Sequence, residues 1–491
     1  MLIALLLAFG AAWLSQTFTY IPLSEDFMHA ASFNSGFVDY VKSLYEITGI
    51  RRSFGMVSNV PLCAAPVVVT NYILLAEHLI ATLLIYDVSR RLSRSSTTAY
   101  VCALLFGVMP LGYGAITYAC GSYVIAPTIF LLLGISIMLR HVENPKWREG
   151  VVVAVCSTSF IVCCILAEHL VFATAFAGFL AFTNQSTVQK MPIKAICQPL
   201  ILAPACTVAI YILLILVTQS GSGLMDAKWE DASMTETFNP TTLLSVWYYQ
   251  WRNILYLEPL FSLVAIEASL HEIGVVRILV GIMIVATLLG LLHYVGKKSN
   301  ERLAGEGLKE RPSIPWWRSS VPVVLMMMLG ASLVHALAGG YSVSSRHNYV
   351  PLALVVLLLA AASPYLVNKL SYLARYRFAL LAVLSMVAIL TNWLVIGINR
   401  YELCRYTAIC DFFEDNPQTE NVRVIYEPPL YYLWPNIAKT TSTPMHHAYA
   451  INWALKARKA KEVVISENAS IVILASREEV VLQRKESRDS D

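Results

Sequence analysis

The sequence is poor in charged residues. Asp, Glu, Lys and Arg make up 14% of its 491 residues, whereas an ordinary soluble domain carries roughly 25%. So few charges cannot cover the surface of a soluble protein of this length, which excludes a string of soluble domains. The formal net charge is only +4, so nucleic acid is not expected among the partners.

Several enzyme motifs are also missing. The sequence has no glycine-rich phosphate loop, no Cys-x-x-Cys pair and no zinc-type spacing of cysteine and histidine. A P-loop protein and a zinc protein therefore have no support in the sequence.

Long apolar stretches are abundant, with 57% hydrophobic residues and a mean hydropathy of +0.60. A helix that crosses the hydrocarbon core needs about 20 mostly apolar residues. Windows of this length predict an all-α polytopic membrane protein with about 11 transmembrane helices. These windows are 2–19, 64–87, 98–116, 122–140, 150–168, 169–184, 197–218, 274–295, 319–339, 350–368 and 378–399.

The fifth and sixth windows form one apolar stretch. Residues 150–183 are interrupted only by Glu168 and His169. We predict a tight hairpin of two helices with this polar pair at the bend. A single long span followed by a re-entrant segment is the alternative.

The distribution of lysine and arginine predicts the orientation. With the N-terminus in the cytoplasm, the short inside loops hold most of the basic residues between spans, and the longer outside loops hold few. An odd number of spans then places the C-terminus outside. We expect a multi-pass protein of a bacterial inner membrane, with its active face toward the periplasm.

The outside segments are large. The loops 20–62 and 219–273 have apolar or aromatic residues at roughly helical spacing, which predicts amphipathic helices lying in the membrane interface. After a transmembrane domain over 1–399, we predict a small C-terminal α/β domain outside the membrane, over 400–476, and a charged tail over 477–491.

Patterns inside this C-terminal domain predict its elements. Residues 423–426 are typical of a strand, and 448–460 of a helix. The runs 461–466 and 471–476 are rich in β-branched residues and predict a hairpin.

The strongest catalytic candidates are Glu25 and Asp26, which follow the first predicted span directly. Charged groups at a membrane edge are costly and often functional. The pKa of such a carboxyl responds to desolvation and to nearby cations, which suits a general base. A solvated acidic turn that caps the next helix is the alternative.

A second candidate lies between the ninth and tenth predicted spans, in the segment 344–351. Its Arg346 can hold a phosphate or carboxylate in bidentate fashion, with His347 and Tyr349 beside it. The alternative is an arginine that only extends to the membrane interface.

Two further outside pairs carry charge. Arg51 and Arg52, in the first loop, are placed to face a lipid phosphate. Asp226 and Lys228, in the second large loop, could contact an acceptor, although a solvated loop explains them equally.

The pentapeptide Leu-Ala-Glu-His-Leu occurs twice, at 75–79 and 166–170. In the predicted topology Glu168 and His169 lie near the outer face and could join the site. Glu77 is predicted near mid-membrane, hydrogen-bonded to the adjacent histidine or to a neighbouring helix.

Together these features resemble the GT-C-type integral membrane glycosyltransferases, which include the protein O-mannosyltransferases and the aminoarabinose transferases of lipid A. The resemblance rests on the span count, on Glu25 and Asp26, on the Arg-x-x-Tyr-x-Pro element at 346–351, and on the outside C-terminal domain. It implies transfer of a sugar from a polyprenyl-phosphate carrier to a glycan, lipid or protein acceptor. Asp26, or Glu25 next to it, would be the base, and Arg346 would hold the carrier phosphate. No metal-binding Asp-x-Asp motif is obvious, which favours the metal-independent branch without a cofactor.

Three other functions fit parts of the pattern. A polysaccharide polymerase or O-antigen ligase would use the same carriers on the same face. A secondary transporter would show broken helices near mid-membrane and an internal repeat, and the pentapeptide is the only repeat found. A membrane scaffold would have no reason to hold Asp26 and Arg346 at one depth.

Overall fold

The computed structural model describes most of the helical bundle and of the C-terminal domain. The described residues are mostly helical. They are 2–17, 36–42, 67–109, 122–145, 147–167, 170–188, 199–218, 319–337, 349–366, 407–419, 421–426, 448–465, 471–475 and 480–484, with a few single positions between them.

Within these ranges, nine of the eleven predicted spans are helical. The helices are α1 (Leu2–Thr17), α5 (Val67–Ser93), α6 (Ser96–Val108), α8 (Ser122–Glu143), α9 (Glu149–Leu166), α10 (Val171–Val188), α11 (Pro199–Thr218), α15 (Val321–Leu337) and α16 (Tyr349–Leu366). The predicted spans 274–295 and 378–399 lie almost wholly outside the described residues.

Three of the described helices are long and apolar enough to cross a membrane. They cover Val69–Ser93, Val124–Glu143 and Glu149–Leu166, and five further apolar helices are shorter over their described residues. This is consistent with a membrane protein. The full set of about 11 spans stays a prediction.

The apolar stretch 150–183 is divided into two helices. α9 ends at Leu166, Ala167 is extended, and α10 begins at Val171. This break agrees with the hairpin prediction and not with one continuous span. Glu168 and His169 lie outside the described residues.

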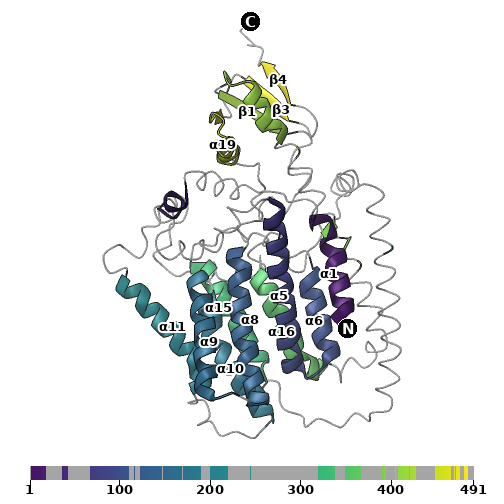
Figure 1. The fold of residues 1–491 in the computed structure, drawn as a ribbon, viewed down its shortest axis with the longest axis vertical. Coiled ribbons are helices and arrows are strands. Elements are labelled where there is room, and N and C mark those ends of the chain that lie inside the picture. The colour runs from purple at the N-terminus through teal and green to yellow at the C-terminus, as the bar shows by residue number, and fades with distance from the viewer. Residues whose placement is uncertain are drawn as a thin grey trace.

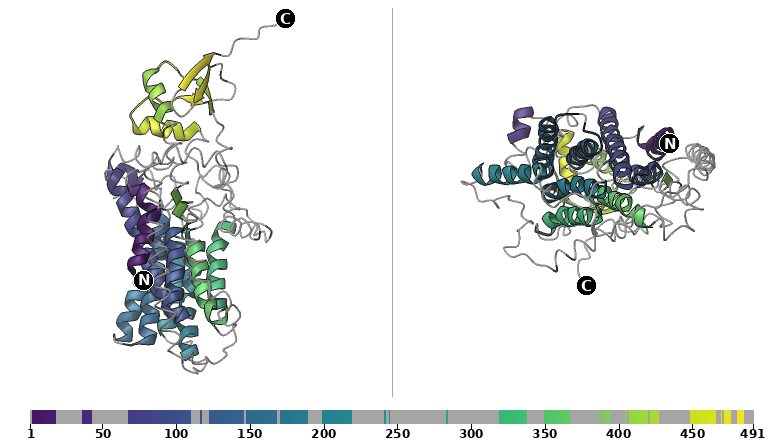
Figure 2. Two further views of the ribbon diagram at one scale, coloured as in Figure 1. Left: turned by 90° about the vertical axis from the view of Figure 1, so that its right-hand side faces the viewer. Right: turned by 90° about the horizontal axis from the view of Figure 1, so that it is seen from below.

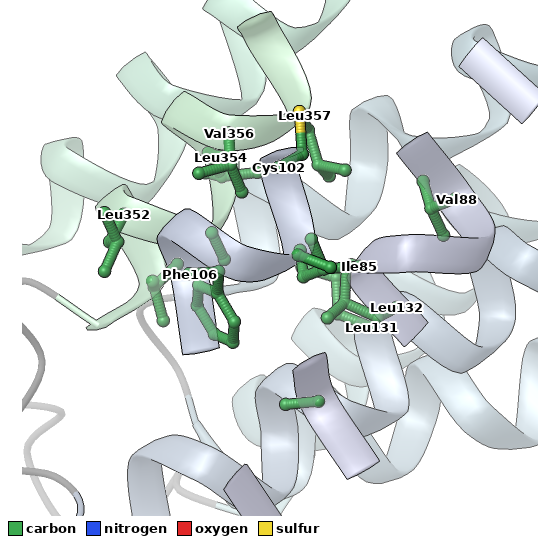
Figure 3. Close-up of a cluster of buried hydrophobic side chains, with 14 of the residues drawn as sticks. Ile85, Val88, Cys102, Phe106, Leu131, Leu132, Leu352, Leu354, Val356 and Leu357 are labelled. Carbon is green, nitrogen blue, oxygen red and sulfur yellow. The ribbon is translucent and has the colours of Figure 1, made fainter. Parts of the chain in front are cut away.

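One hydrophobic core joins helices that are distant in sequence. Figure 1 shows the helices as one bundle, and Figure 2 shows the same bundle from the side and from below. Figure 3 shows side chains of α5, α6, α8 and α16 meeting in this core. All of the labelled residues are buried: Ile85, Val88, Cys102, Phe106, Leu131, Leu132, Leu352, Leu354, Val356 and Leu357.

Some glycines lie where two helices are in close contact. A Cβ added at Gly134 of α8 would lie 2.6 Å from the ring of Phe160 in α9, and one at Gly178 of α10 would lie 2.0 Å from the carbonyl oxygen of Ile201 in α11. Small residues permit such close contacts between membrane helices. The bundle is therefore packed tightly at these points.

The four-stranded sheet and α19 (Ala448–Ala457) gather beyond one end of the bundle (Figure 1). We call this the sheet-side end, and the opposite end the far end. At the far end, α5 and α8 are joined by ion pairs among Asp87, Arg90, Arg91, Arg140 and Glu143, which we call the far-end ion network.

Asp87 is the centre of this network. Its carboxylate accepts two hydrogen bonds from Arg91, each of 3.1 Å, one from Ser136 at 2.6 Å and one from Arg140 at 3.2 Å. Arg91 also donates to Glu143. The network ties the end of α5 to the end of α8.

The C-terminal sheet has the strand order β2-β1-β3-β4. β1 (Asn421–Tyr426) is central and runs parallel to both β2 (Val464–Ile465) and β3 (Ile471–Ala475), whereas β4 (Val480–Arg484) is antiparallel to β3. α19 and the helical residues 407–415 pack on one face of the sheet, and their apolar side chains meet Val422 and Ile473.

The hairpin predicted from 461–466 and 471–476 is wrong. Both runs do form strands, but β1 lies between them and pairs with each in parallel. Parallel pairing needs a crossover, which α19 supplies between β1 and β2. The sheet also continues through β4, so Val480–Arg484 of the predicted charged tail is a strand.

A short helix forms within the predicted first loop, 20–62. Residues 37–42 are helical, Tyr40 is buried, and Phe37 and Val38 are exposed. The rest of that loop, and nearly all of 219–273, lies outside the described residues.

Lys459, just after α19, has a left-handed backbone with φ of 61°. The amide of Ala460 donates to the carbonyl of Leu455 across it, which closes the helix end. We expect Lys459→Gly to stabilise the protein by about 1 kcal/mol, because glycine adopts this conformation without strain. Chemical unfolding, followed by a probe in the C-terminal domain, measures the effect.

Lys456→Gly is the matched control. It lies on an exposed position in the last turn of the same helix, where glycine costs up to about 1 kcal/mol. If both variants lost stability, the backbone at Lys459 would not be strained.

Candidate functional site

Only one residue of the predicted site lies in the described part of the chain. It is Tyr349, the first residue of α16. The other predicted site residues lie outside it: Glu25, Asp26, Arg51, Arg52, Glu168, His169, Asp226, Lys228, Arg346 and His347.

Tyr349 is fully buried at the sheet-side end of the bundle. Its hydroxyl lies 2.9 Å from Nδ1 of His78, and its ring packs on Phe106 with centroids 5.1 Å apart. The contact joins α16 to α5 across 271 positions of sequence. Tyr349 thus fixes the start of α16, and with it the end of the Arg-x-x-Tyr-x-Pro element.

His78 is the hub of a buried polar cluster. Its Nε2 lies 3.2 Å from the carbonyl oxygen of Gly107, which also accepts a 2.8 Å hydrogen bond from Nε1 of Trp13. Because a carbonyl can only accept, Nε2 carries the proton, and Nδ1 accepts from the Tyr349 hydroxyl. Both ring nitrogens are therefore satisfied within the protein.

Aromatic rings enclose His78. The rings of Phe9, Trp13, Phe106 and Tyr349 have centroids between 5.3 and 5.6 Å from that of His78. An imidazole held this way has a structural role, because it connects α1, α5, α6 and α16 at one level of the bundle.

The last carbonyls of α6 accept hydrogen bonds from side chains elsewhere in the chain. Gly107 accepts from Trp13 and His78, and Val108 accepts a 2.8 Å hydrogen bond from Asn392. Trp393 donates in turn to the carbonyl of Ala11 at 2.9 Å. The end of α6 is thereby capped by three separate segments.

Glu77 lies beside this cluster and points toward α8. Its Oε1 accepts a 2.9 Å hydrogen bond from Ser122, the first residue of α8. Its Oε2 is buried and has no hydrogen-bond partner among the described residues. The predicted contact with a neighbouring helix is found, since Glu77, near the middle of α5, meets the first residue of α8.

These contacts supply what the sequence reasoning missed. The Leu-Ala-Glu-His-Leu pentapeptide marked Glu77 and His78 as unusual, but no local pattern pointed to Trp13, Asn392 or the backbone of Gly107. Among the described residues, no group of three His, Cys, Asp or Glu side chains could hold a metal ion.

No protein-family model matches this sequence, and no curated protein matches it.

Proposed function

We propose that this protein is a membrane glycosyltransferase that moves a sugar from a polyprenyl-phosphate carrier to an acceptor hydroxyl at the sheet-side face of the membrane. The observation that carries the proposal is the position of His78 between Trp13, near the end of α1, and Tyr349, at the start of α16. The segments that bear Asp26 and Arg346 therefore leave the bundle at neighbouring points.

Covalent connectivity limits how far these residues can lie from those points. Arg346 precedes Tyr349 by three residues, a reach of about 10 Å, and Asp26 follows Thr17 by nine, a reach of about 30 Å. Both reaches are compatible with one site at this end of the bundle.

The proposed division of labour follows from the chemistry of inverting transfer. The acceptor hydroxyl must lose its proton as it attacks the anomeric carbon, which Asp26, or Glu25 beside it, would accept. Charge that develops on the departing phosphate needs fixed cations, which Arg346 and His347 would supply with Arg51 and Arg52. Glu168, His169, Asp226 and Lys228 would shape the acceptor side, whereas the buried Tyr349 would hold the start of α16 in place behind it.

Two substitutions test these roles in a purified transfer assay with a polyprenyl-phosphate sugar. Asp26→Asn is expected to lower kcat by roughly 100-fold or more, as loss of a general base does. Arg346→Ala is expected to lower the affinity for the donor more than the affinity for the acceptor. It should also abolish the rise in thermal stability that polyprenyl phosphate gives the wild type by mass action.

Glu25→Gln is the comparison for Asp26→Asn, since it also removes one carboxylate, and loss of transfer in only one of the two variants identifies the base. Unchanged transfer in both variants would refute the carboxylate base and favour a ligase that relies on arginine. If polyprenyl phosphate never shifts the stability of the wild type, the transporter becomes the better hypothesis, with Glu77 as its first residue to test.

A further inference from the structure

The far-end ion network has more positive than negative charge. Arg90, Arg91 and Arg140 face the two carboxylates of Asp87 and Glu143. One positive charge is therefore left over within a small space at the ends of α5 and α8.

The three arginines differ in exposure. The Arg91 side chain is 9% exposed and pairs with both Asp87 and Glu143. The side chains of Arg90 and Arg140 are 47% and 60% exposed. Arg90 reaches Asp87 with one terminal nitrogen at 3.6 Å, and Arg140 with Nε at 3.2 Å. Each of these two guanidinium groups has further N–H donors for another anion.

Asp87 holds the two exposed guanidinium groups close to each other. Both pair with the same carboxylate, one from α5 and one from α8. The carboxylate reduces the repulsion that would otherwise push them apart. Two guanidinium groups held together in this way match the two free oxygens of a phosphodiester.

A nearby tryptophan indicates the depth of this cluster in the membrane. Trp147, in the turn between α8 and α9, is 59% exposed. Exposed tryptophan side chains in membrane proteins gather at the level of the lipid headgroups. Arg140 lies near the end of the helix that leads into this turn, so the same level is expected for its guanidinium group.

We propose that Arg90 and Arg140 form a binding site for the phosphodiester headgroup of an anionic membrane lipid, with Asp87 and Arg91 as its rigid base. The site depends on the membrane assignment and not on the proposed sugar transfer. It lies at the far end of the bundle, away from the Tyr349 cluster, so the two proposals can fail separately.

The test measures the thermal stability of the detergent-solubilised protein during titration with phosphatidylglycerol or with phosphatidylcholine. Phosphatidylglycerol is expected to raise the unfolding temperature more than phosphatidylcholine. The double variant Arg90→Gln/Arg140→Gln should bind phosphatidylglycerol more weakly, by about fivefold for each arginine removed. Added salt should reduce the effect, because exposed charges are screened.

The matched control is Arg423→Gln/Lys456→Gln, which removes two exposed cations from the C-terminal domain. An equal loss of lipid binding in this control would overturn the site, as would a double variant that binds like the wild type. Arg90→Lys/Arg140→Lys keeps the charge, and it should retain part of the binding if the site is correct. If inorganic phosphate raised the unfolding temperature as much as phosphatidylglycerol does, the lipid assignment would be refuted.

Discussion

Gly178→Ala is expected to cost about 3 kcal/mol of stability and to separate α10 from α11. The added methyl group would lie 2.0 Å from the carbonyl oxygen of Ile201 and 2.9 Å from its carbonyl carbon. Overpacking of a core usually costs about 1–3 kcal/mol, and the upper part of this range applies where the obstacle cannot rotate away. Here the obstacle is helix backbone, so one helix must move.

Thermal unfolding in detergent measures this loss. Gly150→Ala is the control, because a Cβ at Gly150, near the start of α9, has nothing within 4 Å. That variant should be neutral or slightly more stable, since alanine favours helix. Equal unfolding temperatures for the two variants would show that α10 and α11 are not in this close contact.

Asp87→Asn is expected to destabilise the bundle by about 3 kcal/mol. Asp87 accepts hydrogen bonds from Arg91, Ser136 and Arg140, and the Arg91 side chain is 9% exposed. Removing one partner of a buried ion pair costs about 3–5 kcal/mol. The lower end is expected, because Arg91 keeps its contact with Glu143.

Glu143→Gln provides the comparison for Asp87. Its side chain is 36% exposed, so solvent screens the pair with Arg91, and a loss of under about 1 kcal/mol is expected. Asp87→Asn/Arg91→Met should recover part of the stability lost in Asp87→Asn, because it removes the uncompensated charge. If Glu143→Gln proved the more harmful change, Asp87 would not be the centre of the network.

The helices were predictable because their cause is local. About 20 apolar residues in a row make a membrane helix wherever they occur, and each described helix of the bundle lies on a predicted window. The repeated pentapeptide marks the limit of local reasoning. At 75–79 it continues a long helix, whereas at 166–170 α9 ends at Leu166 and Ala167 is extended.

The sheet and the polar cluster depend on contacts between distant residues. β1 lies between β2 and β3 in the sheet, although both follow it by about 40 residues in the sequence. No pattern within β2 or β3 indicates that β1 separates them. Tyr349 was singled out from its motif, but its partner His78 lies 271 positions away. Hydrogen-bond partners at such separations are set by how helices pack, which a single sequence does not specify.

The shortness of α6 has a consequence for the membrane around it. A helix of 13 residues is about 20 Å long, roughly 10 Å less than the thickness of the hydrocarbon layer. If α6 begins at the headgroups of the far side, the carbonyls of Gly107 and Val108 lie well below the opposite surface. Backbone groups can lie at that depth only where protein shields them from lipid, as Trp13, His78 and Asn392 do.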